Sequence, residues 1–272
     1  MQNRILTLGA AVAMLAAGLC SCSEKETEVA TYENNYEQTL VQDDSASVQI
    51  SHSIQYYKSY EGGRALRRKI NDAIVRSCFG EEYAGLMVEE ASDAVSDTLI
   101  ANYQKDAGES YDEYLAYSKD NENDYDWTPA TFCNWYYRTV GGFGEGFMNL
   151  QTYQVLSESY TGGAHGMYYS IPYIIDMKTG EIVTENDLFK PGYVAPVTGL
   201  IKARLESEQG SDSFEGMFQD GMVPNGKCGV SLEGVTWFYQ PYEIASYAEG
   251  IIKVTVSWAE LKPYLNSEYL KL

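Results

Sequence analysis

The amino-acid sequence predicts an α+β fold with a largely antiparallel sheet and segregated helices. Two observations support this prediction. Several segments alternate apolar and polar residues with a period of two and are joined by short turns, as antiparallel strands are. Other segments repeat apolar residues three and four positions apart, which is the spacing of an amphipathic helix. Because the helical segments do not alternate regularly with the strands, the pattern favours α+β over a parallel α/β sheet.

The clearest strand and hairpin signal lies in the middle of the chain. Apolar residues alternate over residues 167–175, which predicts a strand. Residues 176–180 read Asp-Met-Lys-Thr-Gly, a turn sequence in which glycine supplies a positive φ angle, and residues 181–183 return as a short partner strand. Thr184 followed by Asp187 resembles a capping box and predicts the start of a helix.

The other elements follow from the same periodicities and from glycine and proline breaks. In the first half of the chain we expect a strand at 48–57, a helix at 66–78, a second helix at 88–103 with a continuation to 115, a strand at 131–140, a glycine turn at 141–144 and a strand at 147–159. In the second half we expect a helix at 197–208, a loop-rich stretch at 210–234, a strand at 235–240, a one- to two-turn helix within 242–250 and a last strand at 251–258.

Residues 1–21 are predicted to be a lipoprotein signal peptide. A short basic start precedes an apolar run at 5–19. This run is shorter than the about 20 apolar residues that a helix needs to cross a membrane. Leu19 and Ser21 stand at positions −3 and −1 before Cys22 and resemble a bacterial lipobox. That resemblance implies cleavage before Cys22 and its acylation. The alternatives are a plain secretory signal or a membrane anchor.

The net charge restricts the class of partner. The chain carries 19 basic and 39 acidic residues, a formal net charge of −20. Residues 1–21 contain a single charged residue, Arg4, so the mature chain would carry 18 basic and 39 acidic residues, a net charge of −21. A chain this acidic is repelled by nucleic acid and attracts basic partners. We therefore expect no nucleic-acid binding.

Three cysteines follow the expected lipidation site: Cys78, Cys133 and Cys228. They lie far apart and form no Cys-x-x-Cys pair, so the spacing argues against a zinc site and against a thioredoxin-like motif. Two interpretations remain open. The three residues form one disulfide and one free thiol, as an oxidising compartment permits, or all three are small buried apolar side chains.

Three motifs together resemble one known module. They read YTGGAHG at 160–166, IDMKTGEIVTENDLF at 175–189 and FYQPYEIASYAEG at 238–250. In this order they resemble the paired extracytoplasmic domain of unknown function found in the lysozyme-sensing anti-sigma factor RsiV and in PdaC-type peptidoglycan deacetylases. The resemblance covers roughly residues 48–265. It does not extend to the sigma-binding and catalytic parts of those proteins, so it implies recognition at the cell envelope without either of those functions.

The resemblance also implies a division of the chain. Residues 22–45 are polar and acidic without apolar periodicity, and we expect them to be a flexible linker. Residues 46–185 are expected to form the N-terminal part of the RsiV-like module, and residues 186–265 its C-terminal part. The acidic residues directly after Cys22 resemble the export signal of surface lipoproteins in Bacteroidetes-like bacteria. We therefore expect a lipid-anchored protein of the cell envelope, at the outer membrane on its periplasmic or surface face.

Tyrosine is the residue in excess, with 24 copies. Most of them suit half-buried sheet faces, but tyrosine also suits protein interfaces and stacking against sugars. The strand at 131–140 has aromatic residues on both of its faces, so one aromatic face must lie away from the main core. Tyr136 and Tyr168 are therefore our candidates for exposed binding contacts. Tyr242 is a further candidate, against the alternative that Tyr242 and Tyr247 pack a short helix onto the sheet.

His165 is one of only two histidines and lies between Ala164 and Gly166. We expect it to contact the backbone of a tight turn, and a binding contact is the alternative. It has no partner at metal-ligand spacing, and no nucleophile elbow, cofactor loop or other catalytic motif accompanies it. Adjacent acidic pairs such as Glu89 and Glu90 are expected to be solvated surface residues. We therefore expect no catalytic residues, no metal and no cofactor.

These observations favour a lipid-anchored, non-catalytic binding module of the cell envelope. The resemblance and the negative charge indicate lysozyme or another basic envelope-active protein as its partner. One alternative is a protein that binds glycan or peptidoglycan fragments through exposed tyrosines. A second alternative is an envelope hydrolase whose catalytic residues follow no familiar pattern.

Overall fold

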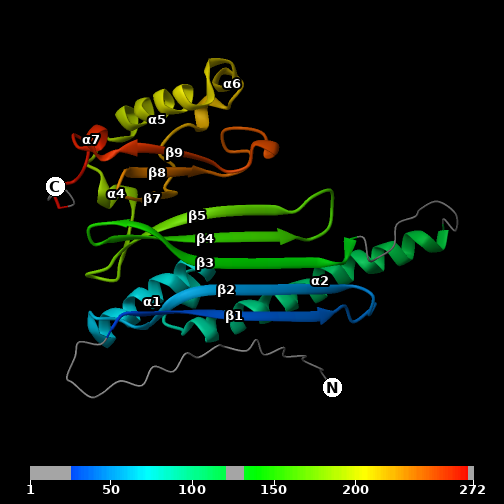
Figure 1. The fold of residues 1–272 in the computed structure, drawn as a ribbon. Coiled ribbons are helices and arrows are strands. Elements are labelled where there is room, and N and C mark those ends of the chain that lie inside the picture. Colours follow the sequence, from blue (N-terminus) through cyan, green and yellow to red (C-terminus); the bar gives the residue numbers. More distant parts are fainter. Residues whose placement is uncertain (1–25, 121–131, 269–272) are drawn as a thin grey trace.

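A computed structural model describes residues 26–120 and 132–268 of the chain. The predicted signal peptide, Cys22 and residues 121–131 lie outside these ranges. Two sheets lie one beyond the other, with two long helices behind the larger sheet and one helix beyond the smaller sheet (Figure 1). No helix within the described ranges is long and apolar enough to cross a membrane.

The larger sheet has six strands in sequence order. They are β1 (Glu28–Thr39), β2 (Ser47–Ser59), β3 (Trp135–Phe147), β4 (Leu150–Tyr160), β5 (Met167–Asp176) and β6 (Ile182–Val183). All neighbouring pairs are antiparallel except β2 and β3, which are parallel because two helices connect them. The predicted α+β fold with a largely antiparallel sheet is therefore confirmed.

The helices α1 (Gly63–Phe79) and α2 (Val88–Asp120) cover one face of the larger sheet. Alternate residues of β2 are buried against them, including Val48, Ile50 and Ile54, because successive side chains of a strand point to opposite faces. One apolar cluster forms around α1 and a second around α2. The opposite face of β1, β2 and β3 remains exposed to solvent.

The smaller sheet consists of β7 (Cys228–Val230), β8 (Gly234–Tyr239) and β9 (Ile252–Ser257). The helical elements around it are α4 (Glu185–Leu188), α5 (Val194–Gln209), α6 (Ser211–Glu215) and α7 (Trp258–Leu261). The largest apolar cluster among the described residues lies here and includes the fully buried Trp237. The predicted capping box exists: the Thr184 backbone N–H donates to Asp187 Oδ2 at 2.9 Å and begins α4.

A buried carboxylate joins these elements. Glu185 is only 6% exposed. Its Oε1 accepts hydrogen bonds from Trp237 Nε1 at 2.7 Å and from the Gly226 backbone N–H at 3.0 Å, and its Oε2 accepts one from the Tyr193 hydroxyl at 2.9 Å. The Cys228 thiol lies close to this carboxylate. Glu185 therefore ties α4, the start of α5 and the smaller sheet together.

Side chains close the strand edges where the two sheets meet. Gln240 acts like a neighbouring strand for Ser170 of β5: its Oε1 accepts from the Ser170 N–H at 2.8 Å and its Nε2 donates to the Ser170 carbonyl at 2.9 Å. The Thr152 hydroxyl does the same for Val230 of β7, with both distances at 2.8 Å. Backbone groups that would otherwise be unpaired are thereby satisfied.

The expectation of a flexible linker over residues 22–45 is wrong for residues 28–39. These residues form β1, which pairs with β2 along its whole length. Tyr32 and Tyr36 point toward the helix layer and are partly buried, whereas Glu33 and Glu37 alternate with them on the exposed face. Residues 28–39 are polar in composition because one face of this edge strand is exposed to solvent. On the other face, tyrosine takes the place of the aliphatic residues that usually mark a strand.

Two further local expectations are also wrong. Residues 141–144 are part of β3 and do not form a turn. A Cβ atom on Gly141 would lie 2.5 Å from the Tyr153 hydroxyl oxygen, so the glycine lets that ring approach the strand. Residues 242–250 form turns with one 3₁₀ turn at Tyr247–Glu249, where we expected a longer helix.

The three described cysteines are free. Cys78, Cys133 and Cys228 each contact a different apolar cluster, so no two of them are neighbours in the fold. Burial raises the pKa of the Cys78 thiol to about 12 and that of Cys133 to about 11, and it raises the pKa of Cys228 as well. Of the two interpretations, the structure supports buried apolar side chains without a disulfide.

Candidate binding surface

The exposed face of β1, β2 and β3 is polar because the register places alternate residues of all three strands there. Three cross-strand rows make up this face, read from β1 to β3: Glu37, Gln49 and Tyr136; then Asn35, Ser51 and Arg138; then Glu33, Ser53 and Val140. The residues between these rows point the other way, into the helix layer. The strand alternation of a half-buried sheet therefore creates this surface.

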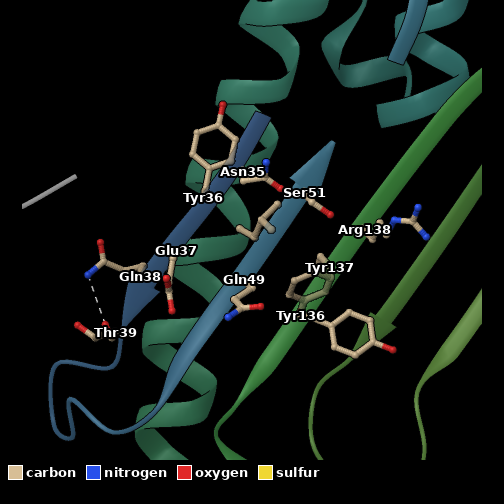
Figure 2. A pocket seen from close by; sticks show the side chains of 11 residues that line it. Asn35, Tyr36, Glu37, Gln38, Thr39, Gln49, Ser51, Tyr136, Tyr137 and Arg138 are labelled. Carbon is tan, nitrogen blue, oxygen red and sulfur yellow. Dashed lines mark hydrogen bonds between the residues drawn. The ribbon is translucent and has the colours of Figure 1, made fainter. Parts of the chain in front are cut away.

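A hollow runs along this face, and we call it the polar groove. Ser51 and Ser53 are small and lie in the middle strand, whereas longer side chains stand on β1 and β3 at either side. The main hollow has a volume of about 630 Å³, and a smaller one of about 240 Å³ shares Asn35, Ser51 and Arg138 with it. Figure 2 shows the lining side chains on β1, β2 and β3, with helix α2 behind the strands.

The polar groove has an excess of negative charge. Glu33 and Glu37 are exposed, and neither forms an ion pair with any residue in the described part of the chain. Arg138, the cation of the groove, is paired with Glu158 of the neighbouring strand at 2.7 Å. Two carboxylates on β1 are therefore available to a basic group of a ligand.

An aromatic cluster lies beside the groove and is centred on Tyr247. The His165 ring stacks on Tyr247 with centroids 4.5 Å apart and an interplanar angle of 28°. Tyr242 lies 5.5 Å from Tyr247 at 35°, and Tyr168 meets it edge-on at 5.7 Å and 72°. The Tyr247 hydroxyl donates to the Gly166 carbonyl at 2.8 Å. This hydrogen bond holds the loop between β8 and β9 against the turn before β5.

Tyr136 connects the aromatic cluster to the polar groove. It lines the groove and stacks on Tyr160 of β4, with centroids 6.2 Å apart and an interplanar angle of 23°. A Cβ atom on Gly166 would lie 3.0 Å from the Tyr136 hydroxyl oxygen, so this glycine allows the phenol to reach the turn. Tyr136 keeps 43% of its surface exposed. Groove and cluster are therefore one continuous surface.

Partial burial, and then the neighbouring phenols of Tyr168, Tyr242 and Tyr136, raise the pKa of Tyr247. The direction follows from the cost of placing a phenolate charge among other phenols with little water. Tyr247 therefore stays protonated at neutral and moderately alkaline pH. Its hydroxyl remains a hydrogen-bond donor to Gly166.

The loop that carries Tyr242 is strained and firmly held. Tyr242 has a φ angle of 69°, which is uncommon for a residue with a side chain, and its ring is 53% exposed. The neighbouring Glu243 fixes the turn: it accepts from the Gln240 N–H at 2.8 Å and pairs with Lys227 Nζ at 3.1 Å. Strain of this kind costs about 1–3 kcal/mol and is concentrated at functional sites. Here it presents an aromatic ring to solvent.

The structure brings the four candidate residues from the sequence together. His165, Tyr168 and Tyr242 contact Tyr247, and the Tyr136 hydroxyl reaches the same turn at Gly166. His165 also makes the expected backbone contact, with Nδ1 2.9 Å from the Gly166 carbonyl oxygen. Cys22, the fifth candidate, lies outside the described residues.

Sequence reasoning missed the groove and the central position of Tyr247. The polar residues of β1 were assigned to a linker, and Tyr247 was considered only as a packing residue. Alternation of Tyr32, Asn34 and Tyr36 with Glu33 and Asn35 was the signal that predicts a strand there. No sequence signal shows that Tyr247 meets a turn 81 positions earlier in the chain.

Residues 26–120 and 132–268 contain no cluster of metal-ligating side chains. No group of three His, Cys, Asp or Glu side chains there is close enough to hold a metal ion. His52 Nε2 does lie 3.0 Å from Ser96 Oγ, but both side chains are buried between β2 and α2, on the face of the sheet opposite to the exposed side chains of the groove. The chemistry available at the surface is hydrogen bonding, ion pairing and contact with aromatic rings.

Comparison with known proteins supports the fold and leaves the function open. Residues 186–259 match the model of a family described as "Protein of unknown function (DUF3298)". A crystal structure of a DUF3298 family member from Bacteroides fragilis NCTC 9343 superimposes with a TM-score of 0.75 at 20% identity, covering 89% of this chain and 95% of that one. A DUF3298 family protein from Pseudomonas aeruginosa PAO1 gives a TM-score of 0.58 at 13% identity, covering 89% and 96%. No curated protein matches the chain.

Proposed function

We propose that this chain, which carries a DUF3298 domain of unknown function, is a non-catalytic binding module of the cell envelope for a basic protein. The observation that carries the proposal is the continuous surface formed by the polar groove and the aromatic cluster. It offers two carboxylates without ion partners, Glu33 and Glu37, beside exposed tyrosine rings.

The two parts of the surface have complementary roles in this proposal. The negative charge of the chain steers a basic partner toward it and raises the association rate, an effect that weakens as salt rises. Tyr136 and Tyr242 supply the apolar contact area that affinity requires, because large rigid aromatic side chains are typical anchors of protein interfaces. Lysozymes are strongly basic, and the resemblance to the RsiV module favours lysozyme as the partner.

A glycan or peptidoglycan fragment is the second candidate ligand. The amide side chains of Asn35 and Gln49 line the groove near the exposed ring of Tyr136. Amide groups bond to sugar hydroxyls, and an exposed ring suits stacking against a sugar. Glu33 and Glu37, which have no ion partner in the described part of the chain, favour the basic protein over a neutral sugar.

The geometry argues against a glycoside hydrolase. Glu33 and Glu37 are four residues apart on one strand, so their Cα atoms are separated by about 13 Å. The two carboxyl groups of glycosidases lie about 5–9.5 Å apart across the scissile bond. The remaining polar groups that line the groove are amides, hydroxyls and the guanidinium of Arg138.

Calorimetric titration with lysozyme tests the proposed partner. We expect saturable one-to-one binding at low salt that persists at about 0.5 M salt with a slower association rate, because the Debye length is then only a few ångströms and steering is lost while aromatic contacts remain. Cytochrome c serves as a basic control protein. Binding that disappears at high salt, and that cytochrome c reproduces, would mean that the chain attracts any basic protein through its net charge and does not recognise lysozyme.

The proposal includes a lipid anchor on Cys22, which would hold the module at the outer membrane, on its periplasmic or surface face. More than one acyl chain gives stable anchoring, since each buried CH₂ contributes about 0.8 kcal/mol. In cells, we expect the protein to fractionate with membranes and its Cys22→Ser variant to appear in the soluble fraction. A Cys22→Ser variant that still fractionates wholly with membranes would rule out this anchor.

A further inference from the structure

We propose that the outer edge of β1 accepts an extended basic polypeptide segment as an added strand of the larger sheet. This inference rests on the proposed function and deepens it, because it states how part of a basic partner would be held. The added strand would lie directly beside Glu33 and Glu37 of the polar groove.

Strand β1 has a long outer edge without a neighbouring strand in the described part of the chain. It contains 12 residues and pairs with β2 on its inner side, and no strand among the described residues pairs with its outer side. The pairing is regular except for one register shift between Glu28 and Val29. The strand contains no proline and no lysine, which are two common means of blocking an edge. Figure 1 shows β1 at the rim of the sheet.

Side chains close the outer edges of other strands in the fold. The Gln240 side chain occupies the outer edge of β5 at Ser170, and the Thr152 hydroxyl occupies the outer edge of β7 at Val230. The last strand of the larger sheet, β6, has only two residues. The edge of β1 differs from these edges in its length: side chains engage it at the Thr39 carbonyl, through Gln104, and at the Asn35 N–H, through Asn34, and the 12-residue strand has no neighbouring strand on that side among the described residues.

Negatively charged side chains lie on both faces of the sheet at this edge. Glu33 and Glu37 stand on the groove side. On the opposite side, helix α2 runs along β1: the Tyr36 hydroxyl donates to Asp93, and Gln104 Nε2 donates to the Thr39 carbonyl at 2.7 Å. Asp93 belongs to an acidic row on α2 with a spacing of four residues, which continues at Glu89 and Asp97.

The negative charge on both faces of the β1 edge determines which kind of polypeptide can pair with it. A second copy of β1 would place carboxylates opposite carboxylates, which is unfavourable in a strand pair. A basic segment would instead place cations opposite them. Because alternate residues of a strand share a face, cations four residues apart would meet Glu33 and Glu37 together. The occupant is therefore an extended chain with lysine or arginine at positions i and i+4.

Synthetic peptides test the added strand. The probe is a nine-residue peptide of threonine and valine with lysine at positions 3 and 7. Two control peptides keep the sequence and charge but carry N-methyl groups, one at odd and one at even positions. A paired strand directs alternate N–H groups to its neighbour, so we expect one N-methylated peptide to lose at least about tenfold in affinity and the other to keep most of it. Equal binding of the two would overturn the proposal.

Charge variants of the full chain add a matched comparison. We expect Glu33→Gln with Glu37→Gln to weaken binding of the parent peptide about fivefold, because two opposite-charge pairs are lost. Glu206→Gln with Glu208→Gln removes the same charge from the exposed surface of α5 and is expected to leave binding within about twofold. Equal weakening by both double variants would show that only net charge matters and would overturn the proposal.

Hydrogen exchange separates this inference from the proposed function. In the complex with lysozyme, we expect alternate backbone amides of residues 28–39 to exchange at least about tenfold more slowly than in the free protein. Lysozyme binding without protection of β1 would refute the added strand and leave the proposed function standing. Protection of β1 by the peptide, with no binding of lysozyme in calorimetry, would support the edge and refute lysozyme as partner.

Discussion

Replacing Glu185 by leucine is expected to lower the free energy of unfolding by about 3–5 kcal/mol. The change leaves three buried donors without an acceptor: Trp237 Nε1, the Tyr193 hydroxyl and the Gly226 backbone N–H. Each unsatisfied buried donor costs about 1–3 kcal/mol, and relief from burying the carboxylate offsets part of the sum. Urea unfolding followed by tryptophan fluorescence measures the difference.

Two further substitutions define what the Glu185→Leu result means. Glu185→Gln keeps the shape and one acceptor oxygen, and we expect it to cost about 1–2 kcal/mol. Glu181→Gln removes a carboxylate whose ion pair with Lys69 is exposed, and we expect a change below about 0.5 kcal/mol. If Glu185→Leu stays within 1 kcal/mol of the parent, the carboxylate does not tie the smaller sheet together.

Acidification is expected to destabilise the protein through His52. This ring is 3% exposed, and its Nε2 lies 3.0 Å from Ser96 Oγ while its Nδ1 has no partner in the described structure. Burial lowers the pKa of His52 to about 4, and the negative charge of Asp93 opposes part of that shift. In the unfolded chain the pKa of histidine is about 6.5.

The sign of the effect follows from these two pKa values. Between pH 6.5 and pH 4 the unfolded chain binds a proton at His52 that the folded chain does not bind. The stabilisation is therefore complete above pH 6.5 and falls as the pH drops, by about 3 kcal/mol at pH 4. Above pH 6.5 this residue contributes no pH dependence.

A variant isolates His52 from the carboxylates that titrate in the same range. His52→Leu removes this titration while Asp187 and Glu260 remain, each with a pKa lowered by hydrogen bonds from the start of a helix. We expect the difference in unfolding free energy between parent and variant to shift by about 3 kcal/mol between pH 7 and pH 4, to the disadvantage of the parent. Parallel stability curves for the two proteins would contradict the account.

Local patterns predicted the parts of the fold that are decided locally. The alternation at 167–175 gave β5, and the turn at 176–180 gave the short hairpin to β6. The Thr184 and Asp187 pair gave the start of α4, because a capping box uses only neighbouring residues. Each of these signals lies within a few residues of the structure it describes.

Features that depend on distant partners escaped prediction. Residues 28–39 look like a linker because their inner face is tyrosine and asparagine, and only pairing with β2 makes them a strand. Residues 141–144 look like a turn because of their glycines, whereas the Tyr153 ring requires that glycine within a strand. The aromatic cluster depends on contacts of Tyr247 with His165 and Tyr168, residues about 80 positions earlier in the chain, and local sequence patterns do not report such contacts.

Tyr136 and Tyr242 are the proposed contacts for a basic protein partner. The most direct measurement is the dissociation constant for lysozyme with the Tyr136→Ala and Tyr242→Ala double variant, beside a Tyr169→Ala control. Tyr169 is similarly exposed, at 40%, but lies on the opposite face of β5 from Tyr168. We expect the double variant to bind about 10- to 30-fold more weakly and Tyr169→Ala to bind within about twofold of the parent. Equal affinity for all three proteins, or no saturable binding by the parent, would contradict the account.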